Sequence, residues 1–115
     1  MGIIRYMAPT NAPAAPHLAE PRPADMRVET VLGALSDPVR LSIVRTLAAT
    51  EGESRSCGSF GLSVSKSTAS HHFRVLRDAG VVRQHDEGRH RLTELRRAEL
   101  DTRFPGLLDS VIAAV

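Results

Sequence analysis

The chain has 115 residues, of which 42% are apolar, and it carries a net charge of +2 and a single cysteine. This length allows one small domain at most. A lone cysteine excludes an intramolecular disulfide, so nothing indicates an oxidising compartment. No run approaches the roughly 18 apolar residues of a membrane span, and the first residues lack the apolar centre of a signal peptide. We therefore expect a cytoplasmic protein with no membrane partner.

Residues 1–25 differ in composition from the rest of the chain. They hold five of the seven prolines together with several alanines. Such a composition favours an extended, disordered tail. We accordingly predict a tail over residues 1–25 and one folded domain over residues 26–115. A core of this size is often completed by a second subunit.

Amphipathic helices open the predicted domain. A first helix is expected over residues 26–35, where four apolar residues recur at helical spacing. A second is expected over residues 38–49, because Asp37 can cap it and Pro38 is tolerated in its first turn. A weaker helix is expected over residues 54–61. The apolar residues of the first helix are Val28, Val31, Leu32 and Leu35.

The segment from residue 65 to residue 80 has the pattern of one helix with both ends marked. Ser65 is a suitable N-cap, and Gly80 suits the left-handed position that ends a helix. The core-facing stripe is Ala69, Phe73, Leu76 and Ala79. The opposite face carries hydrogen-bonding and cationic side chains, and a helix with such a face fits the major groove of DNA. Together with the preceding short helix it predicts a helix-turn-helix, with residues 65–79 as the recognition helix.

A short basic hairpin follows the recognition helix. Its first strand begins at Val81, residues 86–89 form the turn with Gly88 free to take a positive φ, and residues 90–95 return as the second strand. Such a hairpin can lie along the phosphate backbone or place an arginine in the minor groove. We therefore interpret it as the wing of a winged helix.

The C-terminal segment is expected to hold a helical turn over residues 98–103 and a last helix that begins at Pro105. The first and last helices both carry more apolar surface than one small domain needs. We infer from this that they pair across a dimer interface. The residues assigned to that interface are Val28, Val31, Leu32, Leu35, Leu107, Leu108, Val111 and Ile112.

Positive charge is concentrated in the recognition helix and the hairpin. Between Ser65 and Arg97 there are eight Lys and Arg residues against four acids, and four of the five histidines lie in the same stretch. A local basic stretch in a near-neutral protein is typical of a surface for a polyanion. On charge alone a solvated face explains the pattern equally well, but the helix and hairpin favour DNA.

The predicted DNA contacts are Ser65, Lys66, Ser67, Thr68, Ser70, His71, Arg74, Arg77, Arg89 and Arg91. Arg74 is the first choice for a base contact, because arginine can bond guanine at two atoms. Lys66, Arg77, Arg89 and Arg91 are expected to contact phosphate.

Several of these segments together resemble one known family. Asp37-Pro38-Val39-Arg40-Leu41, Ser70-His71-His72-Phe73, the run from Val75 to Gly80 and the Gly88 turn match the ArsR/SmtB family of bacterial winged-helix regulators in order and spacing. The resemblance covers about residues 27–95. It implies a mainly α-helical fold with a small β-hairpin, in which four helices, the hairpin and a fifth helix follow one another. It also implies a homodimer that reads operator DNA with residues 65–79 and dimerises through its terminal helices.

We therefore expect a sequence-specific transcriptional regulator that binds double-stranded DNA as a homodimer. Two-fold symmetry predicts an inverted-repeat operator with half-sites about one helical turn apart. The chain has no motif of a phosphate loop, a nucleophile elbow or a zinc protease, so an enzyme is not expected. A winged-helix module for protein interaction is the alternative. RNA is less favoured, because one Tyr, three Phe and no Trp offer few stacking platforms.

The sensory sites that the resemblance implies are incomplete in this chain. Where one family site has a Cys-x-Cys pair, the sequence SRSCGSF has one thiol, and the last helix has Asp109 but no histidine. The remaining metal candidates are His85 and His90, which flank the turn and are expected to face each other across the hairpin. Imidazole with a nearby carboxylate suits zinc or nickel. A small-molecule effector, a metal or constitutive binding all stay open.

Two further residues have more than one interpretation. Cys57 is expected to be a small apolar residue of the weak helix, with a redox sensor as the alternative. His72 is expected to pack or bond at the base of the recognition helix, while His71 faces DNA. The two rings are adjacent in sequence and point about 100° apart on a helix, so they do not readily chelate one ion.

Overall fold

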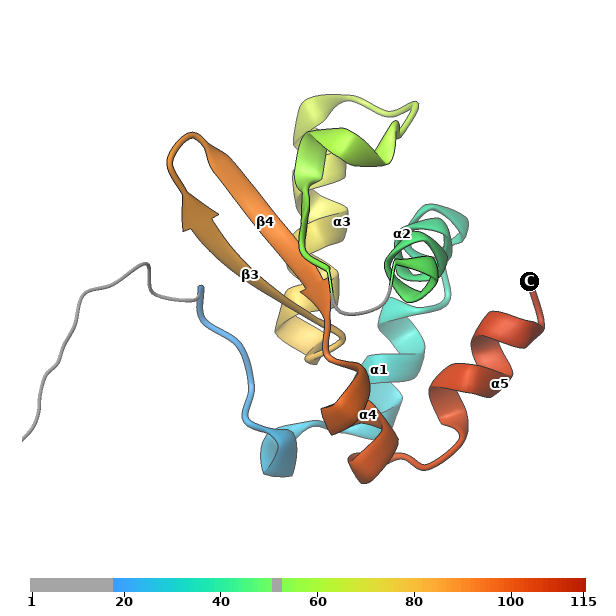
Figure 1. Cartoon of the computed structure of the whole chain (residues 1–115). Coiled ribbons are helices and arrows are strands. Elements are labelled where there is room, and N and C mark those ends of the chain that lie inside the picture. Colours follow the sequence, from blue (N-terminus) through green and yellow to red (C-terminus); the bar gives the residue numbers. More distant parts are fainter. Residues whose placement is uncertain (1–17, 51–52) are drawn as a thin grey trace, which may run out of the picture.

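The computed structural model describes residues 18–50 and 53–115. Helices pack around a small antiparallel sheet, and its hairpin lies beside the helix formed by Lys66–Ala79 (Figure 1). The predicted fold class, mainly helical with a small hairpin, is confirmed. With η for a 3-10 helix, the order is η1 (Pro23–Asp25), α1 (Val28–Ala34), α2 (Pro38–Ala49), β2 (Arg55–Ser56), η2 (Cys57–Phe60), α3 (Lys66–Ala79), β3 (Val82–Glu87), β4 (His90–Leu95), α4 (Arg97–Arg103) and α5 (Leu107–Ala113).

Helix α2 begins with the N-terminal cap that its sequence predicts. The Asp37 carboxylate accepts hydrogen bonds from the backbone N–H groups of Val39 at 2.9 Å and Arg40 at 3.1 Å. It therefore satisfies two of the donors that the first turn of a helix leaves unpaired. Helix α1 is shorter than the predicted span of residues 26–35, since Met26 and Arg27 precede it in extended conformation.

The predicted helix over residues 54–61 is wrong. The segment instead forms strand β2, which pairs antiparallel with β4, followed by the single 3-10 turn η2. Gly61 ends that turn in the left-handed conformation with φ of 64°. Glycine is a weak helix former, and the backbone bonds to β4 are available only after folding. The sheet consequently has three strands in the order β2-β4-β3.

Helix α3 has the caps that its sequence predicts. The Ser65 hydroxyl accepts a hydrogen bond from the Thr68 N–H at 3.2 Å. At the other end Gly80 has φ of 90°, and an added Cβ there would lie 2.9 Å from Met26 side-chain atoms. Glycine is thus required both by the backbone conformation and by the close packing.

The wing is a tighter hairpin than predicted. Glu87 pairs with His90, so the turn consists of Gly88 and Arg89 rather than spanning residues 86–89. Gly88 has φ of 62°, which suits the first central position of a two-residue hairpin turn. The strands extend further toward the tip than the prediction placed them, and Arg89 lies at the tip itself.

Residues 18–25 belong to the folded domain, although the sequence places them in the predicted tail. The Leu18 N–H donates to the Gln84 carbonyl at 2.9 Å, and Arg96 donates to the Pro21 carbonyl at 2.7 Å. Glu20 accepts a hydrogen bond from Arg83 at 3.2 Å. Figure 1 shows this segment running beside the hairpin toward α4. The rest of the predicted tail, residues 1–17, lies outside the described residues.

The core contains side chains from all five α-helices and from the base of the wing. The buried apolar residues are Met26, Val31, Ala34, Leu35, Ile43, Val44, Leu47, Phe73, Leu76, Ala79, Val81, Val82, Leu100 and Leu108.

The last helix begins at Leu107, after Gly106 with φ of 80°, and not at Pro105 as predicted. Within residues 18–50 and 53–115, no helix has the length and apolar composition to cross a membrane.

Candidate nucleic-acid interface

The outer face of α3 presents polar and cationic side chains to solvent. The first acidic residue on this helix is Asp78, near its C-terminal end. The N-terminal turns therefore combine the positive end of the helix dipole with Lys66 and several hydroxyls, which favours an approaching polyanion. The predicted DNA contacts that are exposed here are Ser65, Lys66, Ser67, Thr68, Ser70, His71 and Arg74.

A polar contact anchors the opposite side of α3 to α2. His72 is 9% exposed, and its Nδ1 lies 3.0 Å from Arg40 Nη1. An arginine can only donate, so Nδ1 is the acceptor in this contact. Arg40 also donates to the Ala34 carbonyl at 2.6 Å. This contact sets the position of the recognition helix relative to the first two helices.

The backbone N–H groups of Arg40 and Val39 donate to the Asp37 carboxylate and lower its pKa. The backbone hydrogen bond from Arg40 is the largest cause that holds the pKa of this carboxyl below its ordinary value of 3.8, and the charge of Arg40 and the backbone hydrogen bond from Val39 act in the same direction. The capping carboxylate is therefore ionised at neutral pH and complements the helix dipole.

Two of the predicted phosphate contacts are held by partners within the chain. Arg77 Nη1 donates to Gln84 Oε1 at 2.7 Å, so this guanidinium lies against the wing. Arg91 pairs with Asp86 through Nε at 2.8 Å and Nη2 at 3.3 Å. Lys66, Arg74 and Arg89 have neither an ion pair nor a side-chain hydrogen bond in residues 18–50 and 53–115.

Two arginines at the base of the wing, Arg83 and Arg96, are paired with glutamates of the same chain. Arg83 contacts Glu99 at 2.8 Å and Glu20 at 3.2 Å. The side chain of Arg96 is only 2% exposed and contacts Glu99 at 3.2 Å and Glu20 at 3.6 Å. We call these four residues the arginine–glutamate staple, because it joins residues from the N-terminal segment, β3 and the start of α4. Its charges are neutralised internally and are not part of the basic surface.

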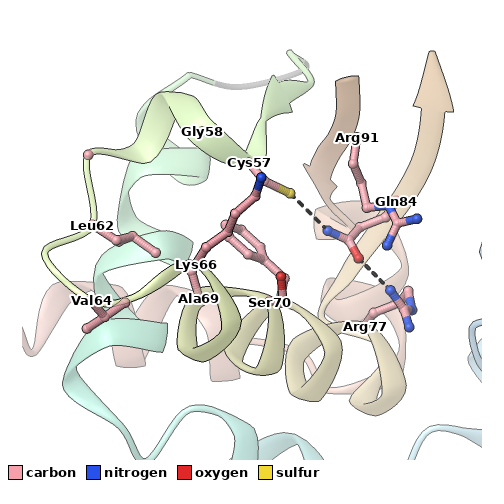
Figure 2. Close-up of a pocket in the computed structure, with 12 residues that line it drawn as sticks. Cys57, Gly58, Leu62, Val64, Lys66, Ala69, Ser70, Arg77, Gln84 and Arg91 are labelled. Atoms are coloured by element: carbon pink, nitrogen blue, oxygen red, sulfur yellow. Dashed lines mark hydrogen bonds between the residues drawn. The ribbon is translucent and has the colours of Figure 1, made fainter. Parts of the chain in front are cut away.

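A buried polar cluster on the inner side of the wing was not foreseen from the sequence. Gln84 is 1% exposed, and Figure 2 shows it accepting from Arg77 and donating through Nε2 to Cys57 Sγ, at 3.4 Å. The same Nε2 also donates to Thr93 Oγ1 at 2.9 Å. The available signal was the strand alternation, since Gln84 shares the phase of buried Val82. Cys57 is half-buried and not on an α-helix, but it packs against the core.

The predicted dimerisation residues divide into three sets by exposure. Val31, Leu35 and Leu108 are buried in the core of the chain. Val28 and Leu32 of α1 are 42% and 46% exposed. The half-buried members, all on α5, are Leu107, Val111 and Ile112.

The predicted histidine pair is not arranged as expected. His85 lies opposite Leu92 and His90 opposite Glu87, so the two histidines share a face of the hairpin but do not face each other. A turn over residues 86–89 would have placed His85 directly opposite His90. The observed two-residue turn pairs Glu87 with His90 instead, so His85 lies two positions farther from the turn. Within the described part of the chain, no group of three His, Cys, Asp or Glu side chains is close enough to hold a metal ion.

Comparisons with known proteins agree with this geometry. A family model described as a helix-turn-helix domain matches residues 35–85. The chain is 39% identical over 83 residues to the uncharacterized HTH-type transcriptional regulator YceK of Bacillus subtilis (strain 168), covering 70% of this chain and 82% of that protein. Its fold is similar to that of an ArsR-like transcriptional regulator from Rhodococcus sp. RHA1, with a TM-score of 0.57 and 27% identity over 76% of this chain and 87% of that one.

The comparisons and the structure lead to the same class of protein. The family model and the YceK relative are of the helix-turn-helix type, and both relatives are transcriptional regulators, which are not enzymes. The structure adds the wing, the capped recognition helix and the exposed polar face that this class requires. The chain belongs to the ArsR-type family of winged helix-turn-helix transcriptional regulators.

Proposed function

We propose that the protein binds a specific double-stranded operator with α3 in the major groove and the wing tip on the flanking backbone. The observation that carries this proposal is the distribution of unpaired cations. Lys66 and Arg74 lie on the outer face of α3 and Arg89 lies at the wing tip, and none of them has an acidic partner within the described residues. Phosphate oxygens would supply the missing counter-charges.

In this arrangement Arg74 reads a base. It is exposed on the third turn of α3, beyond the hydroxyls of the first two turns, and a guanidinium can bond guanine O6 and N7 together. Lys66 and Arg89 would contact phosphate. Arg77 and Arg91 become secondary candidates, because each already has a partner inside the wing.

We further propose that the protein acts as a homodimer in the cytoplasm. Val28 and Leu32 on α1 and the half-buried apolar side chains of α5 would form the surface that a second copy covers. A two-fold dimer would present two copies of α3 to successive major grooves, so the operator would be an inverted repeat with centres about one helical turn apart.

Fluorescence anisotropy on the DNA upstream of the gene tests the proposal. The wild-type chain should bind this DNA roughly 10³-fold or more tightly than a shuffled duplex at the same salt. Arg74→Ala should lose about 5- to 150-fold on the native site and much less on the shuffled one, since a base contact contributes about 1–3 kcal/mol of discrimination. Arg45→Ala, which removes an exposed arginine of α2, is the matched control and should bind as the wild type does.

Sedimentation equilibrium of the same complex gives the stoichiometry. Two chains per duplex support the dimer, and one chain per duplex contradicts it. Equal binding of both duplexes contradicts sequence-specific recognition. Binding to neither would favour the alternative of a winged helix that docks onto another protein.

A further inference from the structure

A cavity of about 270 Å³ opens between η2, the first turns of α3 and the inner side of the wing. Figure 2 shows its two unlike walls. One wall is apolar and is formed by Leu62, Val64, Ala69 and Phe73. The other carries the polar groups of the wing and the C-terminal half of α3. Its volume lies just below the range of drug-sized sites, so it suits a small metabolite.

The lining of the cavity is positively charged. Lys66, Arg77 and Arg91 line it, and none of its lining residues within the described chain is acidic. Asp86 neutralises Arg91, but Arg77 has no acidic partner within the described residues and donates to the neutral Gln84 amide. The cavity therefore places a guanidinium without a counter-charge beside an apolar wall.

The hydrogen bonds of this wall fix the side chain of Gln84. Its Oε1 accepts from Arg77 and its Nε2 donates to Thr93 and Cys57. Arg77 Nε is covered by protein atoms, so a ligand would bind the guanidinium through its Nη groups. A carboxylate is the group that an arginine binds most strongly.

We propose that this cavity binds a small apolar carboxylic acid. The carboxylate pairs with the Arg77 guanidinium, while the apolar body lies against Leu62 and Phe73. The acidic head supplies the counter-charge that Arg77 lacks, and the apolar wall favours an acid with a hydrophobic part over a simple inorganic ion.

Ligand binding at this site would act on DNA binding. Lys66 and Ser70 line the cavity and also belong to the exposed face of α3 assigned to DNA. The bound acid adds a negative charge beneath this face and lowers its positive potential, so acid and operator would weaken each other's binding by the same factor. This second step rests on the proposed function, whereas binding of the acid does not.

Isothermal titration calorimetry on the full chain without DNA tests the site with benzoate as the probe. Benzoate should bind at least tenfold more tightly than neutral benzamide and than inorganic phosphate. Arg77→Met should reduce benzoate affinity tenfold or more. Ala69→Leu, which fills the apolar side, should also reduce it tenfold while leaving Arg77 in place. Arg45→Met is the matched control on α2 and should bind benzoate normally.

The outcomes separate the site from the proposed function. Equal binding of benzoate and benzamide, equal binding of phosphate, or full binding by folded Arg77→Met overturns the proposal. Anisotropy at constant ionic strength then measures the coupling, and benzoate should weaken operator binding of the wild type but not of Ala69→Leu. Benzoate binding without any DNA binding would support the carboxylic-acid site and reject the proposed function. DNA binding without benzoate binding would support the proposed function and reject the carboxylic-acid site.

Discussion

Arginines at the outer face of the molecule and at the base of the wing have opposite roles. Arg74 and Arg89 are exposed and have no acidic partner within the described residues. Arg83 and Arg96 lie in the arginine–glutamate staple, each in contact with Glu20 and Glu99. The same residue type thus forms an exposed surface without acidic partners in one region, which we propose for DNA, and joins distant segments of the chain in the other.

The comparison shows why a count of charges along the sequence overestimates the basic surface. Glu20 and Arg83 are 63 positions apart, so their pairing is invisible in any local window. The partners of an arginine decide its role, and those partners are brought by folding. Three substitutions test whether arginines of the two regions differ in this way.

Arg96→Met should have the largest effect, on stability. Removing one partner of a buried ion pair costs about 3–5 kcal/mol, and the partial exposure of Glu99 places this site near about 3 kcal/mol. Urea unfolding measures the change. Arg74→Met, on the outer face, should change stability by less than about 0.5 kcal/mol. A similar small loss for Arg96→Met would show that the staple does not stabilise the fold.

Glu99→Gln should have a smaller effect that depends on pH. Burial favours the neutral carboxyl, but hydrogen bonds and charges of Arg96 and Arg83 outweigh it and hold the pKa of Glu99 below its ordinary 4.5. A lowered pKa contributes stability above the unfolded value, and this contribution is lost as the pH falls through the folded value. The wild type should therefore exceed Glu99→Gln in stability at neutral pH, with the gap closing below pH 4.5.

Urea midpoints taken from neutral pH down into the acid range measure this gap. Asp109→Asn serves as the control, since the Asp109 side chain is 71% exposed and should contribute little at any pH. A gap between wild type and Glu99→Gln that stays constant with pH would contradict the role given to the carboxylate charge.

Arg89→Ala should have the smallest effect and act only on DNA. Loss of one phosphate contact lowers the slope of log affinity against log salt by about 0.9 and weakens native and shuffled duplexes alike. Anisotropy at several salt concentrations gives the slope. Arg83→Ala should leave the slope unchanged, because its charge is already neutralised by Glu20 and Glu99. An equal fall in slope for both variants would erase the distinction between the two regions.

The sequence by itself determined the elements whose signals are local. The caps at Asp37, Ser65 and Gly80 are formed as predicted, because a cap needs only groups within a few residues of the helix end. Three of the four residues in the apolar stripe of α3, Phe73, Leu76 and Ala79, are buried as their spacing predicts, and Ala69 is half-buried. The same local pattern was enough to predict a recognition helix and to identify the family.

Tertiary structure alone decided the features that depend on distant partners. Residues 54–61 follow the edge of β4 instead of their helical spacing, and residues 18–25 dock on the wing although their composition predicts a tail. The cavity beside α3 and the buried position of Gln84 arise from three separate elements. Backbone pairing and ion pairs between remote segments have no local period, so only the folded chain shows which arginines remain for DNA.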